Sequence, residues 1–235
     1  MGVDEAKRAA ELFGGAVEQI PLQIGDLGRA QLSAVIGDDN GETCAALARA
    51  AARHRILFMN VGCADDALRV RACETFTFHV APSEAMFRDA LAQSGRRDRA
   101  SATAWDGLLT RFGADSLNQR FRAAFGQSMT SEAWTAWFAV KVLWESSLRA
   151  KSSSAIALRN YLERDSTQFD GQKGAPLSFR TWDHQLRQPL YVVEPTPNGG
   201  ARVVAELPVA GETESFRAAL DRLGTPQGSS APCGR

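Results

Sequence analysis

The sequence lacks the features that mark several large classes of protein. Its 27 basic residues are balanced by 27 acidic ones, so it has no excess of positive charge for nucleic-acid phosphates. It has no run of about 18 apolar residues, the length a membrane-spanning helix requires. Its start, MGVDEAKRAAELFGG, has no apolar core of a secretory signal peptide. We expect no nucleic-acid partner, no transmembrane segment and no signal peptide in this chain.

Motifs for metals and cofactors are also missing. No P-loop, GxGxxG, GxSxG or HExxH motif occurs, and Asp65-Asp66 have no further carboxylate or histidine at a fixed spacing. No CxxC pair is present, which excludes zinc-ribbon and thioredoxin-like sites. Cys63 and Cys73 either form a disulfide in an oxidising compartment or stay as buried thiols. We therefore expect no metal and no cofactor.

What is present is a chain of 235 residues with an ordinary globular composition, 44% hydrophobic and 23% charged. Strand patterns alternate with helical patterns, which indicates an α/β fold with a parallel sheet. The predicted helices are 3–13, 27–37, 42–54, 83–93, 104–126, 130–150, 153–164 and 212–224. The predicted strands are 16–24, 55–62, 74–80, 177–179, 189–194 and 201–207, with a linker at 94–103.

The stretch TWDHQLRQ places Asp183 directly before His184. Adjacent residues on a strand point to opposite faces, so Asp183 is poorly placed to orient the imidazole of His184 as a catalytic base. Catalytic triads are usually assembled from distant segments. We favour a polar entry into a strand over a catalytic pair, and we expect no enzyme.

Polar residues follow two predicted strands at their carboxyl ends, where ligands bind in α/β sheets. Asn60, Gly62 and Cys63 come after one strand, and Gly62 allows close approach of the backbone. His79 ends the next strand, and it is equally well explained as a buried histidine bonded to backbone. Ser83 is a natural N-cap for the helix that follows.

Two segments resemble the type I periplasmic binding proteins. The first is RILFMNVGCADDALRVRACETFTFHVAPSEAMFRDALAQ, and the second begins with MTSEAWTAWFAVKVLWESSLRA and continues to FDGQKGAPLSFRTWDHQLRQPLYVVEP. These are the solute receptors of ABC importers, of the branched-chain amino-acid-binding kind. The resemblance covers 56–93 and 104–194, and 1–55 more loosely. Within the family the chain looks most similar to a subgroup found with quinoprotein alcohol-oxidation systems.

The resemblance implies two Rossmann-like α/β lobes, with the second much reduced. The first lobe would comprise 1–79 plus 128–186, and the second 80–127 plus 187–235. A small organic solute would bind in the cleft between them, an ABC permease would be the partner, and the location would be periplasmic. The family's ligand loop falls on Asn60, Gly62 and Cys63, with His79 and Ser83 facing the cleft.

This chain also departs from the family pattern. A first buried strand, a strand between 27–37 and 42–54, and most of the second lobe's sheet are expected in the family but are not recognised here. The Asp183–Arg187 stretch would be the crossover between lobes. The alternative to a solute receptor is a degenerate member that serves as an interaction module or binds nothing.

Overall fold

A parallel three-stranded sheet lies at the centre of the computed structural model, which describes residues 1–21, 23–28, 31–38, 41–96, 99–198, 200–225 and 233. Its strands follow the order β1 (Ala34–Gly37), β2 (Leu57–Asn60) and β3 (Thr77–His79). Every residue of β2 is buried, as expected for the middle strand of a parallel sheet. The last residues of the strands are in register, so all three carboxyl ends lie at one edge.

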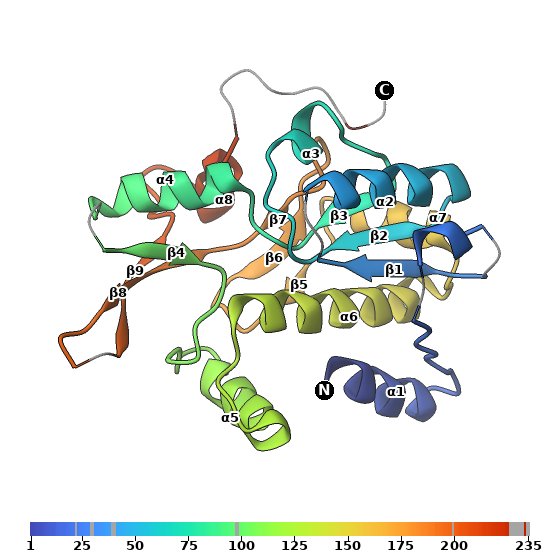
Figure 1. Ribbon diagram of the computed structural model, residues 1–235, viewed down its shortest axis with the longest axis horizontal. Coiled ribbons are helices and arrows are strands. Elements are labelled where there is room, and N and C mark those ends of the chain that lie inside the picture. Colours follow the sequence, from blue (N-terminus) through green and yellow to red (C-terminus); the bar gives the residue numbers. More distant parts are fainter. Residues whose placement is uncertain are drawn as a thin grey trace.

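Helices cover both faces of this sheet (Figure 1). On one face lie α2 (Gly41–His54) and α3 (Ala67–Val70), and α2 packs through buried small residues such as Ala48 and Ala51. On the other face lie α6 (Ser131–Ala150) and α7 (Ala155–Leu162). Thr130 and Ser154 begin these two helices by accepting a hydrogen bond from the third helical N–H.

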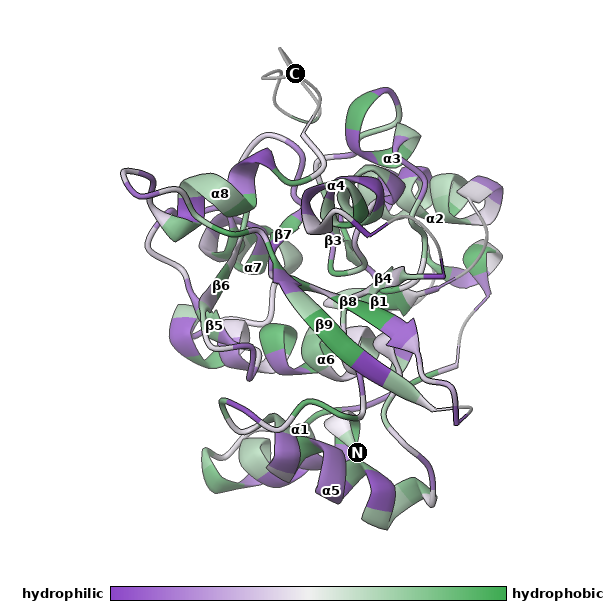
Figure 2. Ribbon diagram, turned by 90° about the vertical axis from the view of Figure 1, so that its left-hand side faces the viewer, coloured by the Kyte–Doolittle hydropathy of each residue, from purple (hydrophilic) through white to green (hydrophobic). Residues whose placement is uncertain are grey.

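A second sheet is antiparallel and extends away from the first (Figures 1 and 2). It has the order β4 (Ser101–Thr103), β8 (Leu190–Pro195) and β9 (Ala201–Leu207). Helix α4 (Glu84–Ser94) packs on it, and its Ala90 is fully buried. The strands predicted at 189–194 and 201–207 are confirmed as β8 and β9, which pair antiparallel.

Short antiparallel strands connect the two sheets. They are β5 (Phe169–Asp170), β6 (Pro176–Phe179) and β7 (Leu186–Arg187). A parallel bridge between His79 and Gln185 joins this group to β3. Helix α8 (Phe216–Arg222) packs beside β7.

The two segments that pass between the sheets are tied to each other by Gln188. Its Nε2 donates to the carbonyl of Val80 over 2.7 Å, and its Oε1 accepts from Lys173 Nζ over 2.7 Å. Lys173 is 1% exposed and its Nζ lies 3.9 Å from the centre of the Trp134 ring. Burial lowers the pKa of Lys173 well below its ordinary value.

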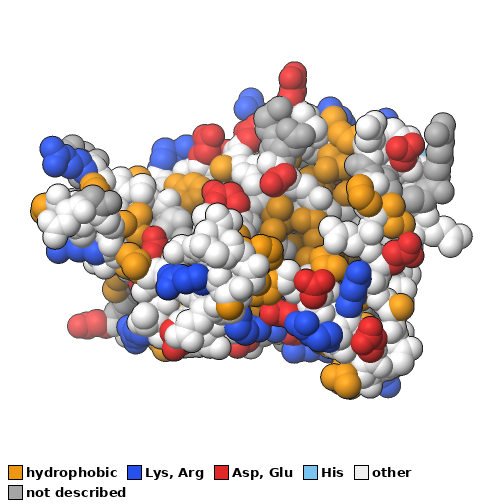
Figure 3. Space-filling view, turned by 60° about the horizontal axis from the view of Figure 1, so that its bottom comes forward, with side chains coloured by type: hydrophobic (Ala, Val, Ile, Leu, Met, Phe, Trp, Pro, Cys, Tyr) orange, Lys and Arg blue, Asp and Glu red, His pale blue; other side chains and the backbone are white. Residues whose placement is uncertain are grey.

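A further layer lies beneath α6, on its side away from the parallel sheet (Figures 1 and 2). It consists of α1 (Gly2–Leu12) and α5 (Ala114–Phe125), joined by an ion pair from Arg120 to Glu5 over 2.8 Å. Seen from this side, the surface has a central hollow with hydrophobic side chains, and charges of both signs are interspersed around it (Figure 3).

The N-terminal region differs from the sequence prediction. The expected strand at 16–24 is wrong, because its described residues are irregular and lead to a short 3-10 turn, Ile24–Asp26. The expected helix at 27–37 is also wrong, since its end is β1. Val35 and Ile36 are β-branched residues that fit a pleated sheet, and here packing overrides the helical reading. The strand that the family pattern expects before the helix at 42–54 is therefore present as β1.

Two other predictions need correction. The linker at 94–103 contains the short strand β4, which pairs with β8. The helix at 104–126 begins only at Ala114, because Asp106 and its neighbours form turns. In α6, Trp137 is buried, whereas Leu148 is exposed.

The cysteines pair differently from either expectation. Cys44 is bonded to Cys63, with Cα atoms 6.6 Å apart, and Cys73 is bonded to Cys233, with Cα atoms 5.1 Å apart. Both the Cys63–Cys73 pairing and the free thiols are therefore wrong. The N–H of Cys233 also donates to Trp182 O over 2.9 Å. The residues around it, 226–232 and 234–235, lie outside the described residues.

The described residues were compared with what a membrane-spanning helix requires. Among those residues, no helix combines the length and apolar character that crossing a bilayer needs.

Candidate functional site

Asn60 and His79 meet at the carboxyl edge of the parallel sheet. They are the last residues of β2 and β3, and the register pairs them directly. Asn60 Nδ2 lies 2.9 Å from His79 Nδ1. An amide nitrogen donates, so Nδ1 accepts and the proton of the neutral imidazole is on Nε2. The expected closeness of these two residues is therefore confirmed.

Asn60 also shapes the loop that follows β2. Its Oδ1 accepts from the N–H of Cys63 over 2.8 Å and from that of Gly62 over 3.3 Å. Its Nδ2 donates to Cys63 O over 2.9 Å. All the polar atoms of the Asn60 side chain are thus used inside the protein, and the disulfide to Cys44 fixes the loop to α2.

Ser83 lies next to this loop but acts as a helix cap. Its Oγ accepts from Met86 N over 3.1 Å, as the sequence predicts. Glu84 N donates to Ala64 O over 2.8 Å, which fastens the start of α4 to the loop after β2. Ser83 is therefore a positioning residue at the edge of the site.

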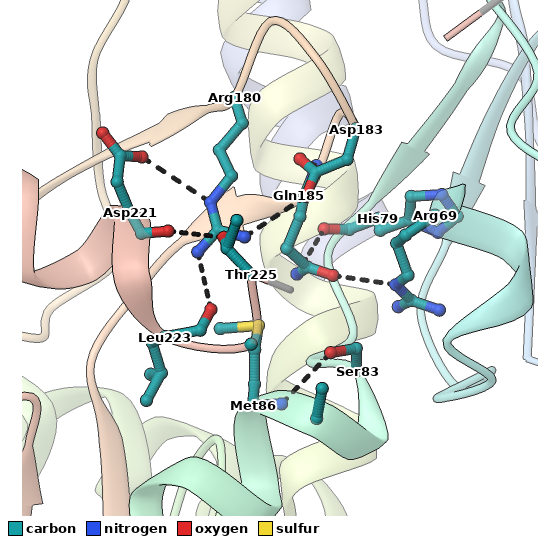
Figure 4. A network of polar contacts seen from close by, with 12 residues as sticks. Arg69, His79, Ser83, Met86, Arg180, Asp183, Gln185, Asp221, Leu223 and Thr225 are labelled. Carbon is teal, nitrogen blue, oxygen red and sulfur yellow. Dashed lines mark hydrogen bonds and ion pairs between the residues drawn. The ribbon is translucent and has the colours of Figure 1, made fainter. Parts of the chain in front are cut away.

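Arg69, which the sequence did not single out, fills the space behind these loops. Its guanidinium donates to the carbonyls of Cys63, Asp65 and Ala81, each within 2.9 Å. Its Nε donates to Gln185 Oε1 over 3.0 Å (Figure 4). Burial lowers the pKa of Arg69 to about 10, so it stays charged at neutral pH. One side chain thus joins two strand-end loops to the crossover segment.

The Asp183–His184 pair has no catalytic geometry. Asp183 accepts from Arg180 over 3.2 Å and from Gln185 N over 3.0 Å. The His184 ring instead stacks on Phe78, with centroids 4.3 Å apart, and contacts Thr77 O and Glu163 Oε1. Arg180 in turn donates to the carbonyls at the end of α8 (Figure 4). These contacts fasten the turn between β6 and β7 to β3 and to the end of α8.

At the carboxyl edge of the parallel sheet, a ligand would reach the backbone of the loops before the buried side chains. Asn60, Cys63, His79 and Ser83 are buried, whereas Gly62 is exposed. A Cβ at Gly62 would lie 2.7 Å from Asp38 Cβ, so the loops after β1 and β2 touch here. Asp38 is exposed, and it was missed because its strand was read as a helix. A polar solute at this edge would meet Gly62 and Asp38 first.

The protonation of His79 predicts how stability depends on pH. Burial lowers its pKa well below the ordinary value, and the charge of Arg69 lowers it further. Below pH ~6.5 the unfolded chain takes up a proton at His79 that the folded chain excludes. The free energy of unfolding is therefore expected to fall between pH 7 and 5.5, by up to about 1.4 kcal/mol per pH unit.

Urea unfolding across this pH range measures the effect, with His79→Asn as the test variant. Asparagine retains an acceptor for Asn60 but does not titrate, so it is expected to flatten the pH dependence. The exposed His54 provides a matched control, and His54→Gln is expected to leave the slope unchanged. An equally steep slope in His79→Asn would contradict the assignment.

Known proteins resemble this chain in fold but not in sequence. No protein-family model matches the sequence, and no curated protein matches it. A periplasmic binding protein from Burkholderia mallei superposes with a TM-score of 0.70 at 14% identity, over 93% of this chain and 94% of that one. An ABC-type branched-chain amino acid transporter from Rhodopseudomonas palustris gives 0.71 at 12%, over 88% and 90%.

A solute-binding protein of an ABC transporter from Rhodopseudomonas palustris, in complex with 3,4-dihydroxybenzoic acid, gives 0.67 at 9% identity, over 88% of this chain and 92% of that one. At such identities the likeness shows the fold alone. The chain has the α/β fold of the type I periplasmic binding proteins, and these neighbours are solute-binding proteins rather than enzymes.

Proposed function

We propose that this protein, having that fold, is the solute-binding component of an ABC-type importer. The observation that carries the proposal is the shared edge of the parallel sheet, where the loops after β1 and β2 meet at Gly62 and the residues after β3 donate to the Asn60 carbonyl. Edges of this kind are where α/β sheets bind small molecules. The ligand would be a small organic solute, the partner a permease, and the protein would not be an enzyme.

The two-lobe division remains part of this proposal. The parallel sheet and β5–β7 fall almost wholly within 1–79 plus 128–186, whereas β4, β8 and β9 fall within 80–127 plus 187–235. This grouping supports a reduced second lobe that faces the first across the crossover segments. Asn60, Gly62, Cys63, His79 and Ser83 would form the first lobe's side of the cleft.

A periplasmic location is supported by the two disulfides. Disulfides persist in oxidising compartments and are rare in the cytosol of ordinary bacteria. The proposed link to quinoprotein alcohol oxidation rests on sequence resemblance. It makes short alcohols, aldehydes and acids worth testing beside amino acids.

The test is a thermal-shift screen of those compounds, followed by calorimetry on any that shift the melting temperature. A bound solute is expected to stabilise the folded protein by mass action, about 2.7 kcal/mol at a concentration of 100 times Kd. If no compound changes the melting temperature of the folded protein, the receptor role fails.

A matched pair of glycine variants locates the site. Gly62→Ala would place a Cβ 2.9 Å from the Asp38 carbonyl oxygen and push the two loops apart, whereas Gly25 has no atom within 4 Å of an added Cβ. We expect Gly62→Ala to weaken binding at least tenfold, ~1.4 kcal/mol, and Gly25→Ala to leave it unchanged. Equal affinities in the two variants would place the ligand elsewhere.

A second candidate function is an interaction module that binds no solute. It is favoured by the burial of Asn60, Cys63, His79 and Ser83, whose polar atoms mostly serve internal contacts. The same ligand screen separates the two candidates, since only a receptor responds to a small molecule.

A further inference from the structure

Strand β1 is paired on only one of its two sides. It stands at the end of the parallel sheet, and among the described residues β2 is its only neighbouring strand. Ser33 O and Gly37 O both accept hydrogen bonds from the β2 side, the latter from Val61 N over 3.0 Å. Backbone groups alternate in direction along a strand, so Ala34 and Ile36 turn theirs away from β2. Within the part of the chain that the structure describes, those groups have no partner.

This free side of β1 has none of the features by which proteins protect an exposed strand. Such strands commonly have a lysine, a proline or a bulge, each of which hinders pairing with another strand. The sequence of β1 is AVIG, and its register with β2 is unbroken. The side chain of Ile36 is 38% exposed. The free side of β1 is therefore open to pairing with a further strand.

The antiparallel sheet provides a contrast. Its end strand β9 is also unpaired on one side among the described residues, but it has the exposed charges of Arg202 and Glu206. The neighbouring β8 has an irregularity between Val192 and Val193. Charges and bulges of this kind oppose the pairing of one sheet with another, so β1 is the better candidate for such a contact.

Apolar side chains lie beside the free side of β1. Ala136, Val140 and Leu143 of α6 are half-buried and recur at helical spacing, so they share one side of the helix. Ala34 of β1 packs against the same core as Ala136 and Leu143. From beneath, hydrophobic side chains gather in a hollow with charges of both signs around it (Figure 3). An apolar centre with a polar rim is the usual anatomy of a protein interface.

Two properties of the chain favour a second copy of itself as the partner. The formal net charge is zero, so two copies do not repel each other at neutral pH. Strands related by a two-fold axis pair antiparallel, which makes one and the same strand complementary to itself. We propose that β1 pairs antiparallel with β1 of a second copy, and that the half-buried side of α6 completes the interface. The two parallel sheets then form one continuous sheet.

The register of this pairing follows from the directions of the backbone groups. Val35 would lie on the two-fold axis opposite the partner's Val35, and Ala34 would exchange both its backbone hydrogen bonds with the partner's Ile36. Asp38 follows the end of β1, so the two Asp38 carboxylates would lie at opposite ends of the paired strands and would not repel each other. The charges near β1 are therefore compatible with the dimer.

The helix α6 is needed in addition to β1, because a pair of four-residue strands is too small for a stable dimer, which buries about 1,000 Å² or more. The two-fold axis runs perpendicular to the joined sheet, so α6 of both copies lies on the same face and the two helices meet across the axis. The carboxyl ends of the two β1 strands point in opposite directions, which leaves Gly62 accessible in both copies. The dimer and the proposed solute site can therefore fail independently.

Analytical ultracentrifugation of the wild-type protein is the first measurement. We expect a concentration-dependent equilibrium between the monomer and a species of twice the chain mass. A protein that stays monomeric throughout the micromolar range would overturn the proposal.

A charged residue on the free side of β1 distinguishes this interface from others. Ile36→Lys places an ammonium group where the two strands meet, and it is expected to raise the dissociation constant of the dimer at least ~tenfold. Ile156→Lys makes the same change at an isoleucine of α7 that is 49% exposed, and it is expected to have no effect. Equal dissociation constants in the two variants would place the interface elsewhere.

Ala34→Pro tests the backbone pairing itself. It removes an N–H that faces away from β2, and proline is tolerated at such positions of an end strand. We expect the monomer to stay folded, as measured by circular dichroism, while the dimer weakens at least ~tenfold. An unchanged dissociation constant in the folded variant would show that β1 does not pair between copies.

Val35→Cys tests the register. Opposed residues of a non-hydrogen-bonded antiparallel pair have Cα atoms about 4.5 Å apart, which a disulfide can span. We expect a covalent dimer on a non-reducing gel, and none from Ile36→Cys, which lies opposite the partner's Ala34. Absence of the covalent dimer from Val35→Cys under oxidising conditions would overturn the antiparallel pairing of β1.

Discussion

Replacing Arg69 by methionine is expected to lower the free energy of unfolding by about 3–5 kcal/mol, because each buried acceptor that loses its hydrogen bond costs roughly 1–3 kcal/mol. The substitution keeps an unbranched chain of similar length but removes every donor of the guanidinium. The carbonyls of Cys63, Asp65 and Ala81 and the side chain of Gln185 would then be left inside the protein without this partner. Urea denaturation followed by circular dichroism measures the loss.

Arg71→Met serves as the matched control, because Arg71 follows closely in sequence and is exposed. Its effect is expected to remain within about 0.5 kcal/mol. If the two variants were equally stable, the three loops would not depend on Arg69 for their packing. Because the same loops form the proposed solute site, Arg69→Met is also expected to weaken solute binding while Arg71→Met does not.

Removing the Cys73–Cys233 disulfide is expected to cost about 5 kcal/mol, the largest effect predicted for this protein. The bond closes a loop with a sequence separation of 160 in a chain of 235 residues, so its loss removes a constraint on about two-thirds of the unfolded chain. The double variant Cys73→Ser/Cys233→Ser avoids a leftover thiol. Its denaturation midpoint, compared with that of the wild type under oxidising conditions, measures the difference.

The Cys44–Cys63 disulfide provides an internal comparison. Its sequence separation is 19, for which the same loop-entropy argument gives a smaller loss of about 3 kcal/mol. Peptide mapping under non-reducing conditions checks the pairing itself. A peptide that links Cys63 to Cys73, or an equal loss of stability in the two double variants, would contradict this account.

The sequence predicted best those elements whose signals are local. Ser83 and Thr130 mark the starts of α4 and α6, because a capping hydroxyl acts within three residues of itself. The buried strand before Asn60 was evident from its apolar run. By contrast, β1 has only four residues, and its two β-branched residues, Val35 and Ile36, are too short a signal to separate a strand from the end of a helix. The fold class could be inferred, but the beginning of the sheet could not.

Site residues could be predicted only where they follow a recognised strand. Asn60 and His79 were found because both end strands of one parallel sheet. Asp38 was missed along with β1. Arg69 had no signal, because its partner Gln185 is 116 residues away and its role depends on tertiary contacts. Long-range pairing of this kind, like that of Cys73 with Cys233, cannot be read from spacing.

The amide of Gln188 restricts how the two large sheets can move. Its Nε2 donates to the carbonyl of Val80 and its Oε1 accepts from Lys173 Nζ, so the two crossing segments are held together at one point. Pulling the sheets straight apart would break both contacts together. Rotation of one sheet relative to the other about an axis through that amide would keep both contacts.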